Sequence, residues 1–337
     1  MSGSTLVCGY RSGDFTDALL ALDPVIHAFD VYHAHAIERK WGRAVACSAQ
    51  LPPGPFDEAY LKAGPKLLSA ELLLDLLQGI YLALSDGGVL HVTFEGSEAD
   101  ALAALKKIFP RVKKVRGDKH ATWLEARREG ELKRVRSFAC EWPASVPGGE
   151  PLMFTSYPGC FCHRRVDAGG LALAETVVAR ELAATDAAAR PLKVLDMGCG
   201  CGLVGLLVAD AARRLGGGAA KAPELTMIDS HARAVAAAAE NAARFGIAAE
   251  CVLADDGVPR DAAHLGVYDV FVGNPPYYSD YRIADVFLQT AWAALRPGGR
   301  CYTVVKTATG LLPVQEKYFR RAEVFRRRNY AVLCSIR

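Results

Sequence analysis

A glycine-rich turn between a strand and a helix constrains the fold more than any other stretch of this sequence. Residues 193–195 read as a short buried strand that ends at Asp196, and residues 203–209 begin an apolar helix. Three glycines at alternate positions separate them, Gly198, Gly200 and Gly202. Such glycines allow backbone conformations that a Cβ forbids and let a ligand approach the main chain, where the new helix offers unpaired N–H groups. The pattern D-x-G-x-G-x-G predicts a ligand-binding unit, with a turn that binds nothing as the alternative.

The residues around this turn indicate what kind of ligand it holds. It has neither the G-x-G-x-x-G of dinucleotide-binding folds nor the G-x-x-x-x-G-K-[ST] of phosphate-binding loops. No lysine follows the glycines to hold a phosphate, and a carboxylate precedes them. The turn therefore favours a ligand with a positively charged end over a polyphosphate.

Two further predicted strands of the same half also end in acids. Strand 225–228 is followed by Asp229, and strand 251–254 is followed by Asp255 and Asp256. Ligands of open α/β sheets collect at the carboxyl ends of strands, where an acid after the second strand suits ribose hydroxyls. One of Asp255 and Asp256 would then accept a hydrogen bond from an adenine amino group.

The predicted strand 267–272 leads into a second motif, Gly273-Asn274-Pro275-Pro276-Tyr277. Consecutive prolines restrict the backbone and remove two N–H donors, so the Asn274 side chain and the Pro275 carbonyl become fixed acceptors. These acceptors would hold the two hydrogens of an exocyclic amine, while Tyr277 stacks on the ring that carries it. Positioning of this kind needs no metal or strong base. A rigid loop without chemistry is the alternative.

The two halves of the chain resemble each other at matching offsets. Phe56-Asp57 precedes Gly87 by nearly the same spacing as Tyr268-Asp269 precedes Gly298, with a helical pattern between and a strand after. These offsets predict a tandem repeat of one α/β unit.

The first copy lacks both motifs. We therefore expect residues 1–140 to form a degenerate domain without cofactor that positions substrate RNA or steadies the second domain. Residues 150–337 are expected to form the domain that carries the chemistry. The Pro- and Gly-rich stretch 140–151 is the expected linker.

Composition and charge limit the remaining possibilities. Of 337 residues, 51% are hydrophobic, and no uninterrupted apolar run reaches the roughly 20 residues of a membrane span. The N-terminus lacks a basic stretch followed by an apolar core, so we expect a cytoplasmic protein. The ten cysteines include two C-x-C pairs, unlike the C-x₂₋₄-C of zinc sites, so we expect reduced thiols and no metal.

Positive charge is concentrated in two segments. Residues 111–136 hold ten Lys/Arg against four Asp/Glu, and residues 313–337 hold seven against two, on a chain whose net charge is only +3. Two basic segments on an acidic body are typical of polyanion binding, and ordinary solvated faces are the alternative.

A polar loop precedes the glycine turn. Residues 161–170 include Arg165 and Asp167 and lead into a predicted helix, 171–184. Charged side chains in such a loop are expected where a chain crosses over a ligand, and solvated side chains are the alternative.

With these motifs the chain resembles the class I S-adenosylmethionine-dependent methyltransferases. Within them it is similar to the two-domain ribosomal RNA guanine-N2 methyltransferases of the bacterial small-subunit type. The residues that carry the resemblance are Arg165, Asp167 and Gly169, Asp196 to Gly202, Asp229, Asp256, and Asn274 to Tyr277. The resemblance implies an α/β fold of two tandem Rossmann-like domains, a degenerate N-terminal one and a C-terminal one with a seven-stranded class I methyltransferase sheet.

The resemblance also implies S-adenosylmethionine as cofactor and a role for each motif. The implied roles are Asp196, Gly198 and Gly200 at the methionine end, Asp229 at the ribose, Asp256 at the adenine, and Asn274 at the target amine. The candidate catalytic residues are Asn274, Pro275 and Tyr277. The candidate cofactor-binding residues are Arg165, Asp167, Asp196, Gly198, Gly200, Gly202, Asp229, Asp255, Asp256 and Asn274. No metal site is expected.

Tyr277 departs from the Phe that is frequent in the guanine-N2 family. The motif N-P-P-Tyr is shared with adenine-N6 and protein-glutamine methyltransferases, so three interpretations remain. They are guanine-N2 methylation of ribosomal RNA, methylation of adenine N6 or of a protein glutamine, and a non-catalytic RNA-binding module. We expect ribosomal RNA or the small-subunit particle as partner, no membrane association, and a monomer.

Overall fold

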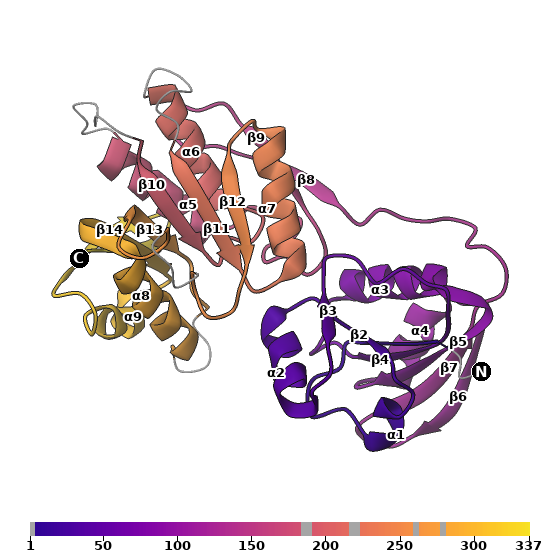
Figure 1. Cartoon of the computed structure of the whole chain (residues 1–337). Coiled ribbons are helices and arrows are strands. Elements are labelled where there is room, and N and C mark those ends of the chain that lie inside the picture. Colours follow the sequence, from indigo (N-terminus) through magenta and orange to yellow (C-terminus); the bar gives the residue numbers. More distant parts are fainter. Residues whose placement is uncertain (1–3, 183–190, 216–222, 259–262, 277–280) are drawn as a thin grey trace. The chain divides into compact units, whose positions relative to one another are not determined.

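Two seven-stranded sheets with the same strand order form the framework of this chain (Figure 1). The computed structural model describes residues 4–182, 191–215, 223–258, 263–276 and 281–337. The chain divides into two units, Met1–Ala139 and Cys140–Arg337, and each contains one of the sheets. The order is β3-β2-β1-β4-β5-β7-β6 in the first unit and β12-β11-β10-β13-β14-β16-β15 in the second. The predicted tandem of two α/β folds is therefore confirmed.

The first unit packs helices on both faces of its sheet. Its strands are β1 (Thr5–Cys8), β2 (Val25–Ala28), β3 (Val45–Cys47), β4 (Phe56–Ala63), β5 (Leu84–Phe94), β6 (Arg111–Gly117) and β7 (Thr122–Arg127). Its helices are α1 (Asp17–Leu20), α2 (Val31–Trp41), α3 (Ala70–Ala83) and α4 (Glu98–Leu105). The apolar helices α3 and α4 pack on one face, where Leu76, Leu77 and Ile80 are buried. On the other face α1 and α2 pack over β1 to β3.

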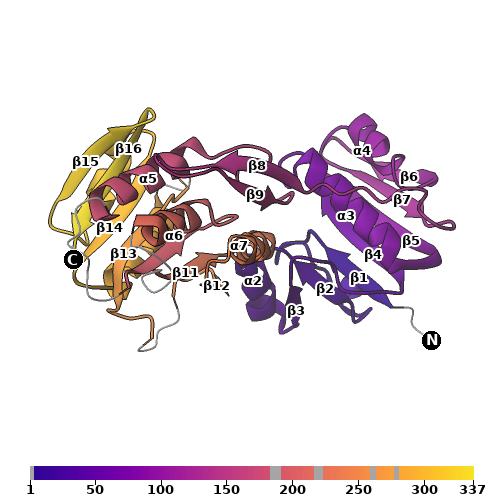
Figure 2. The ribbon, with the colours of Figure 1, turned by 90° about the horizontal axis from the view of Figure 1, so that it is seen from above.

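The second unit has helices on both faces of its sheet. Its main strands are β10 (Lys193–Met197), β11 (Glu224–Asp229), β12 (Ala249–Leu253), β13 (Tyr268–Gly273), β14 (Leu295–Val305), β15 (Ala322–Arg327) and β16 (Tyr330–Ile336). Its helices are α5 (Ala168–Val177), α6 (Leu203–Leu215), α7 (Ala232–Arg244), α8 (Arg282–Ala294) and α9 (Ala308–Gln315). Figure 2 shows α5, α6 and α7 beside the sheet, and their cores share one face of it. Helices α8 and α9 pack on the other face.

The expected linker is instead a β-hairpin of the second unit. Strands β8 (Cys140–Ala144) and β9 (Leu152–Ser156) pair antiparallel. Trp142 stacks on Phe154 with ring centroids 5.3 Å apart, and Phe154 meets Phe245 at the end of α7 edge-to-face at 5.0 Å. The apolar rings around the prolines therefore order this stretch against α7, which the Pro and Gly content alone did not predict.

The helix expected over residues 171–184 begins earlier and changes geometry within the expected range. Asp167 caps α5, so Gly169 and Gly170 belong to the helix and not to the preceding loop. After Val177 the chain forms a π-helical turn, Val178–Leu182. Glu181 in this turn accepts hydrogen bonds from Tyr302 and from Arg300 of β14, which fixes the turn to the sheet.

Helix α7 ends at a glycine in the left-handed region of backbone conformation. Gly246, with a φ of 64°, follows the α7 C-cap, and Ile247 donates its N–H to the Ala242 carbonyl at 2.9 Å, as in a Schellman motif. All ten cysteines lie in described residues and are free thiols. None of the helices that the structure describes has the length and apolar character needed to span a bilayer.

Candidate functional site

Parallel pairing in the second sheet brings the ends of four strands to one edge. Met197 pairs with Ile228 of β11 and with Gly273 of β13. Asp229 at the end of β11 pairs with Leu253, the last residue of β12. The glycine turn, Asp229, the Asp255-Asp256 pair and Asn274 follow these positions directly. They therefore lie along the edge where open α/β sheets bind ligands.

The glycine turn needs its glycines for two different reasons. Gly198, Gly200 and Gly202 have φ angles of 70°, 56° and 87°, in the left-handed region that favours glycine. A Cβ on Gly198 would lie 2.8 Å from the Phe287 ring, and one on Gly202 would lie 2.7 Å from Leu206. A Cβ on Gly200 would meet no atom within 4 Å. Gly198 and Gly202 are thus required by packing, and Gly200 faces open space.

Asp229 braces this turn from the neighbouring strand. Its Oδ2 accepts the Gly200 N–H at 2.9 Å, and its Oδ1 accepts the His231 N–H at 2.9 Å. The Ile228 carbonyl before it accepts N–H groups of Gly198 at 2.8 Å and of Cys199 at 3.0 Å. The acid expected at the ribose therefore also fixes the shape of the glycine turn.

Asp196 lies inside strand β10, one residue before its end, and is only 2% exposed. Its Oδ2 accepts the Gly205 N–H at 2.8 Å, in the first turn of α6. Burial raises the pKa of Asp196 to about 7; the Gly205 hydrogen bond lowers it, and the charge of Asp229 raises it further. The carboxyl beneath the turn is thus sensitive to protonation near neutral pH.

Asp167 connects the start of α5 to the Asn274 side chain. Its carboxylate caps the helix by accepting the N–H groups of Gly169 at 3.1 Å and Gly170 at 2.8 Å. Its Oδ2 also accepts a hydrogen from Asn274 Nδ2 at 2.7 Å. A carboxylate can only accept here, so the NH₂ end of the amide must face Asp167. Asn274 Oδ1 is therefore the acceptor end of the amide, and Asp167 holds it in that orientation.

The remaining candidate residues of the site differ in how far they are buried. Pro275 is buried beside Asn274, whereas Asp255 is half-buried and Asp256 is exposed after β12. Arg165 is exposed, and its side chain contacts the Cys162 thiol. Tyr277 lies outside the described residues.

Sequence reasoning missed Phe287 of α8. Its ring packs beneath the turn, since a Cβ on Gly198 or on Gly273 would come within 2.9 Å of it. Phe287 is an ordinary apolar position of an amphipathic helix, so nothing in its sequence context distinguishes it.

The two cysteines of the turn are packing residues. Cys199 and Cys201 are buried. Burial raises the pKa of Cys201 to about 12 and that of Cys199 well above its ordinary value. Both thiols therefore stay protonated at neutral pH, and neither is a ready nucleophile or metal ligand.

Known proteins similar to this chain include ribosomal RNA methyltransferases. A "Ribosomal RNA small subunit methyltransferase C" from Pseudomonas entomophila is 27% identical over 322 residues, which cover 93% of this chain and 89% of that protein. A "Ribosomal RNA large subunit methyltransferase G" from Streptomyces griseus is 27% identical over 328 residues, which cover 90% and 79% of the two chains.

One solved structure has a closely similar fold. It is a 16S rRNA N2 methyltransferase of T. thermophilus in complex with AdoMet and guanosine. The TM-score is 0.80 at 21% identity, over 99% of this chain and 88% of that one. The likeness extends over both units, so it covers the first, motif-free sheet as well as the second.

The family model that describes the methyltransferase small domain matches residues 151–334. This segment contains the glycine turn, the acids of the strand ends and Asn274, and it makes up more than half of the chain. The chain therefore belongs to the methyltransferase small domain family.

Proposed function

We propose that this protein transfers a methyl group from S-adenosylmethionine to the exocyclic N2 of a guanine in ribosomal RNA. The observation that carries the proposal is the Asn274 amide, held by Asp167 at 2.7 Å on the same sheet edge as the glycine turn. The names of the similar proteins, which specify ribosomal RNA, support the substrate class.

The groups at this edge fit S-adenosylmethionine. Its ammonium suits a buried acid such as Asp196, and its ribose hydroxyls suit the acceptor oxygens of Asp229. The open space at Gly200 allows a ligand to approach the backbone, and Asp255 or Asp256 would accept from the adenine. Bound there, S-adenosylmethionine supplies an electrophilic methyl group.

The protein's own part in the reaction is to hold the amine in place. The lone pair of an exocyclic amine is delocalised into the ring, so the nitrogen reacts only when it is well oriented. Asn274 Oδ1 and the Pro275 carbonyl would accept its two hydrogens. Asp167 keeps the amide from rotating through a charge-assisted hydrogen bond. Catalysis would then come from positioning in a preorganised site.

The two units would divide the work. We propose that the second unit carries the cofactor and the methyl transfer, and that the first unit binds the RNA substrate. The first unit contains the basic segment 111–136, and its edge strand β6 is exposed along most of its length.

Proteins named for both ribosomal subunits match this chain at equal identity. The small subunit is our choice because the 16S rRNA enzyme matches 99% of the chain in fold.

The test is Asn274→Ala in the full-length protein. We expect loss of methyl transfer to ribosomal RNA with cofactor affinity changed only a few-fold, because Asn274 acts on the amine. Nucleoside mass spectrometry of the RNA product identifies the methylated base, and calorimetry gives the cofactor affinity.

Three results would contradict the proposal in different ways. Near-normal methyl transfer by Asn274→Ala would show that Asn274 does not hold the target amine. N6-methyladenosine as the product would be compatible with this role of Asn274 but would show that the substrate base is adenine. If S-adenosylmethionine with a labelled methyl group gave label in protein and none in RNA, the result would favour a glutamine substrate.

A further inference from the structure

The first sheet has an uncovered surface over β4, β5, β7 and β6. Buried residues alternate with partly exposed ones along β4 and β5, and the buried set faces α3 and α4. On the other face, in the part of the chain that the structure describes, α1 and α2 pack over β1 to β3, and their cluster also contacts Tyr60 of β4 at the border of the uncovered surface. A hollow of about 360 Å³ opens there. We refer to this surface as the open face and define it by Tyr60, His91, Thr93, Trp123, Glu125 and Arg116.

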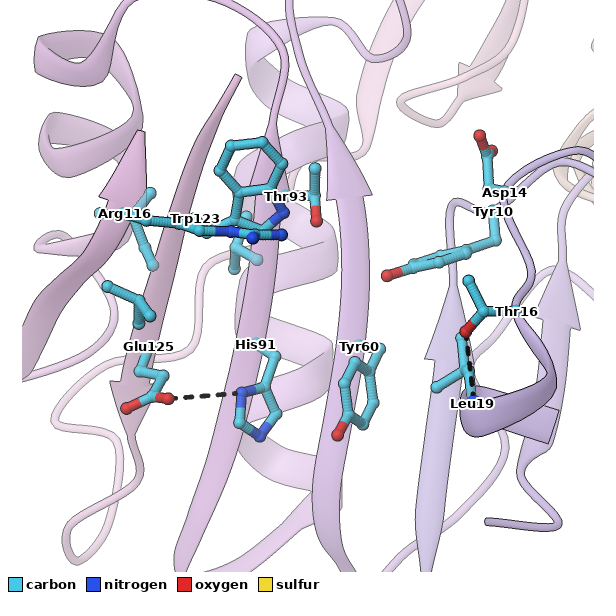
Figure 3. Close-up of a pocket in the computed structure, with 13 residues that line it drawn as sticks. Tyr10, Asp14, Thr16, Leu19, Tyr60, His91, Thr93, Arg116, Trp123 and Glu125 are labelled. Atoms are coloured by element: carbon cyan, nitrogen blue, oxygen red, sulfur yellow. Dashed lines mark hydrogen bonds and ion pairs between the residues drawn. The ribbon is translucent and has the colours of Figure 1, made fainter. Parts of the chain in front are cut away.

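Aromatic rings project from neighbouring strands of the open face. The rings of Tyr60 and His91 stack with centroids 4.7 Å apart and an interplanar angle of 21°. The Arg116 guanidinium lies 4.2 Å from the centroid of the Trp123 ring. Figure 3 shows these side chains on the same side of the sheet. Flat rings and guanidinium groups on an open sheet are the surfaces on which RNA-binding domains stack unpaired bases.

The corresponding positions of the second unit are apolar and covered by a helix. Both β5 and β14 contain a Gly-Gly pair. Aligned on these pairs, the pairing registers relate His91 to Tyr302 and Trp123 to Val332. Tyr302 and Val332 are fully buried in the core that includes α5. The His91 side chain is 28% exposed, and Val115 near the rings is 52% exposed. The open face therefore carries residues suited to contact with a ligand where its counterpart carries a core.

The open face carries both signs of charge. The carboxylates of Glu58 and Glu125 lie 3.7 and 3.8 Å from the His91 ring nitrogens, whereas its cations lie on β6. Lys113 lies opposite Glu125, and Arg116 opposite Trp123, in the register of β6 and β7. Within the described residues neither cation forms an ion pair, whereas Lys62 already pairs with Asp14 at 2.7 Å. Both cations can therefore contact phosphates beside the rings.

We propose that the open face binds single-stranded RNA, with bases stacked on the Tyr60–His91 pair and on Trp123 and with phosphates at Lys113 and Arg116. The proposal rests on the proposed function and deepens it, because it names the surface that holds RNA while the second unit modifies one base. A duplex hides the faces of its bases, so the open face selects unpaired nucleotides.

The test uses the full-length protein and a fluorescein-labelled single-stranded RNA of about ten nucleotides, a length within the range that one such surface covers. Trp123→Ala should weaken binding, measured by anisotropy, roughly 5- to 150-fold, as expected for one lost base stack. Trp123→Phe should keep most of the affinity, because it keeps a flat ring. Lys113→Glu, at an exposed position, should weaken binding. It should also lower the slope of log affinity against log salt concentration by the amount expected for about one phosphate contact.

The matched control is Trp292→Ala. Trp292 of α8 is 42% exposed and has the Arg337 guanidinium 5.3 Å from its ring centroid, so it copies the Trp–Arg pair of the open face. This variant should bind RNA as the wild-type protein does. A duplex of the same sequence should bind Trp123→Ala and the wild-type protein alike.

Unchanged RNA affinity in both Trp123→Ala and Lys113→Glu would overturn the proposal, as would an equal loss in Trp292→Ala. Wild-type protein that does not bind the single strand would overturn it too. In each case methylated guanosine in ribosomal RNA would still support the proposed function. That function fails separately, when the wild-type protein methylates no RNA.

Discussion

At the scale of single residues, Asp196 makes stability depend on pH. Burial raises its pKa to about 7 from 3.8, so the folded state holds a proton that the unfolded state releases above about pH 4. The stabilisation from this proton is complete at low pH and is lost between about pH 4 and pH 7, on the order of 4 kcal/mol in total. We expect the free energy of unfolding of Asp196→Asn, measured with urea, to lack this component.

The informative quantity is the difference between the two proteins across pH, since all other titrating groups are shared. The free energy of unfolding of Asp196→Asn should rise relative to that of the wild-type protein as pH increases from 4.5 to 8. Asparagine can still accept the Gly205 N–H, and it never ionises. Parallel curves would show that the carboxyl is not desolvated.

At the scale of elements, the turn between β10 and α6 contains one glycine that packing requires, Gly198, and one that faces open space, Gly200. Gly200→Ala should cost about 1–2 kcal/mol from its left-handed backbone alone. Gly198→Ala should cost about 1–3 kcal/mol more, because its Cβ would lie 2.8 Å from Phe287. Urea unfolding measures both changes.

A double substitution provides the control for this pair. Phe287→Leu should recover part of the loss in the Gly198→Ala background and none in the Gly200→Ala background. Recovery in both backgrounds, or in neither, would contradict the packing assigned to the turn.

The same elements show how far the sequence could predict the fold and the candidate site. Strands, glycines and strand-end acids follow local patterns, so the edge of the second sheet was predictable. The contact of Asp167 with Asn274 joins residues 107 apart, and no local pattern reports it. The hairpin around Trp142 and Phe154 has the proline and glycine content of a linker, and the stacking of its two aromatic rings is visible only in three dimensions. The open face left a readable signal, since Glu58 and Tyr60 of β4 stand where β13 has Val270 and Val272.

At the scale of the whole molecule, two similar sheets should bind one cofactor. The first has the same strand order as the second, but its sequence lacks the glycine turn and a complete set of strand-end acids. We expect calorimetry on the full-length chain to give one S-adenosylmethionine per chain. Asp229→Ala should weaken cofactor binding by about 1–3 kcal/mol, because it removes the proposed ribose acceptor and the acceptor of the Gly200 N–H. A second binding event that survives Asp229→Ala would assign a cofactor site to the first unit.

Helix α5 has a consequence for how such a duplicated fold diverges. It covers one face of the second sheet, and the acid that caps it also orients Asn274. A copy without this helix would lose the acid that orients Asn274, and with it the proposed catalytic geometry, and would expose a sheet face in the same event. Selection could then act on a ready-made surface in a copy already released from catalysis.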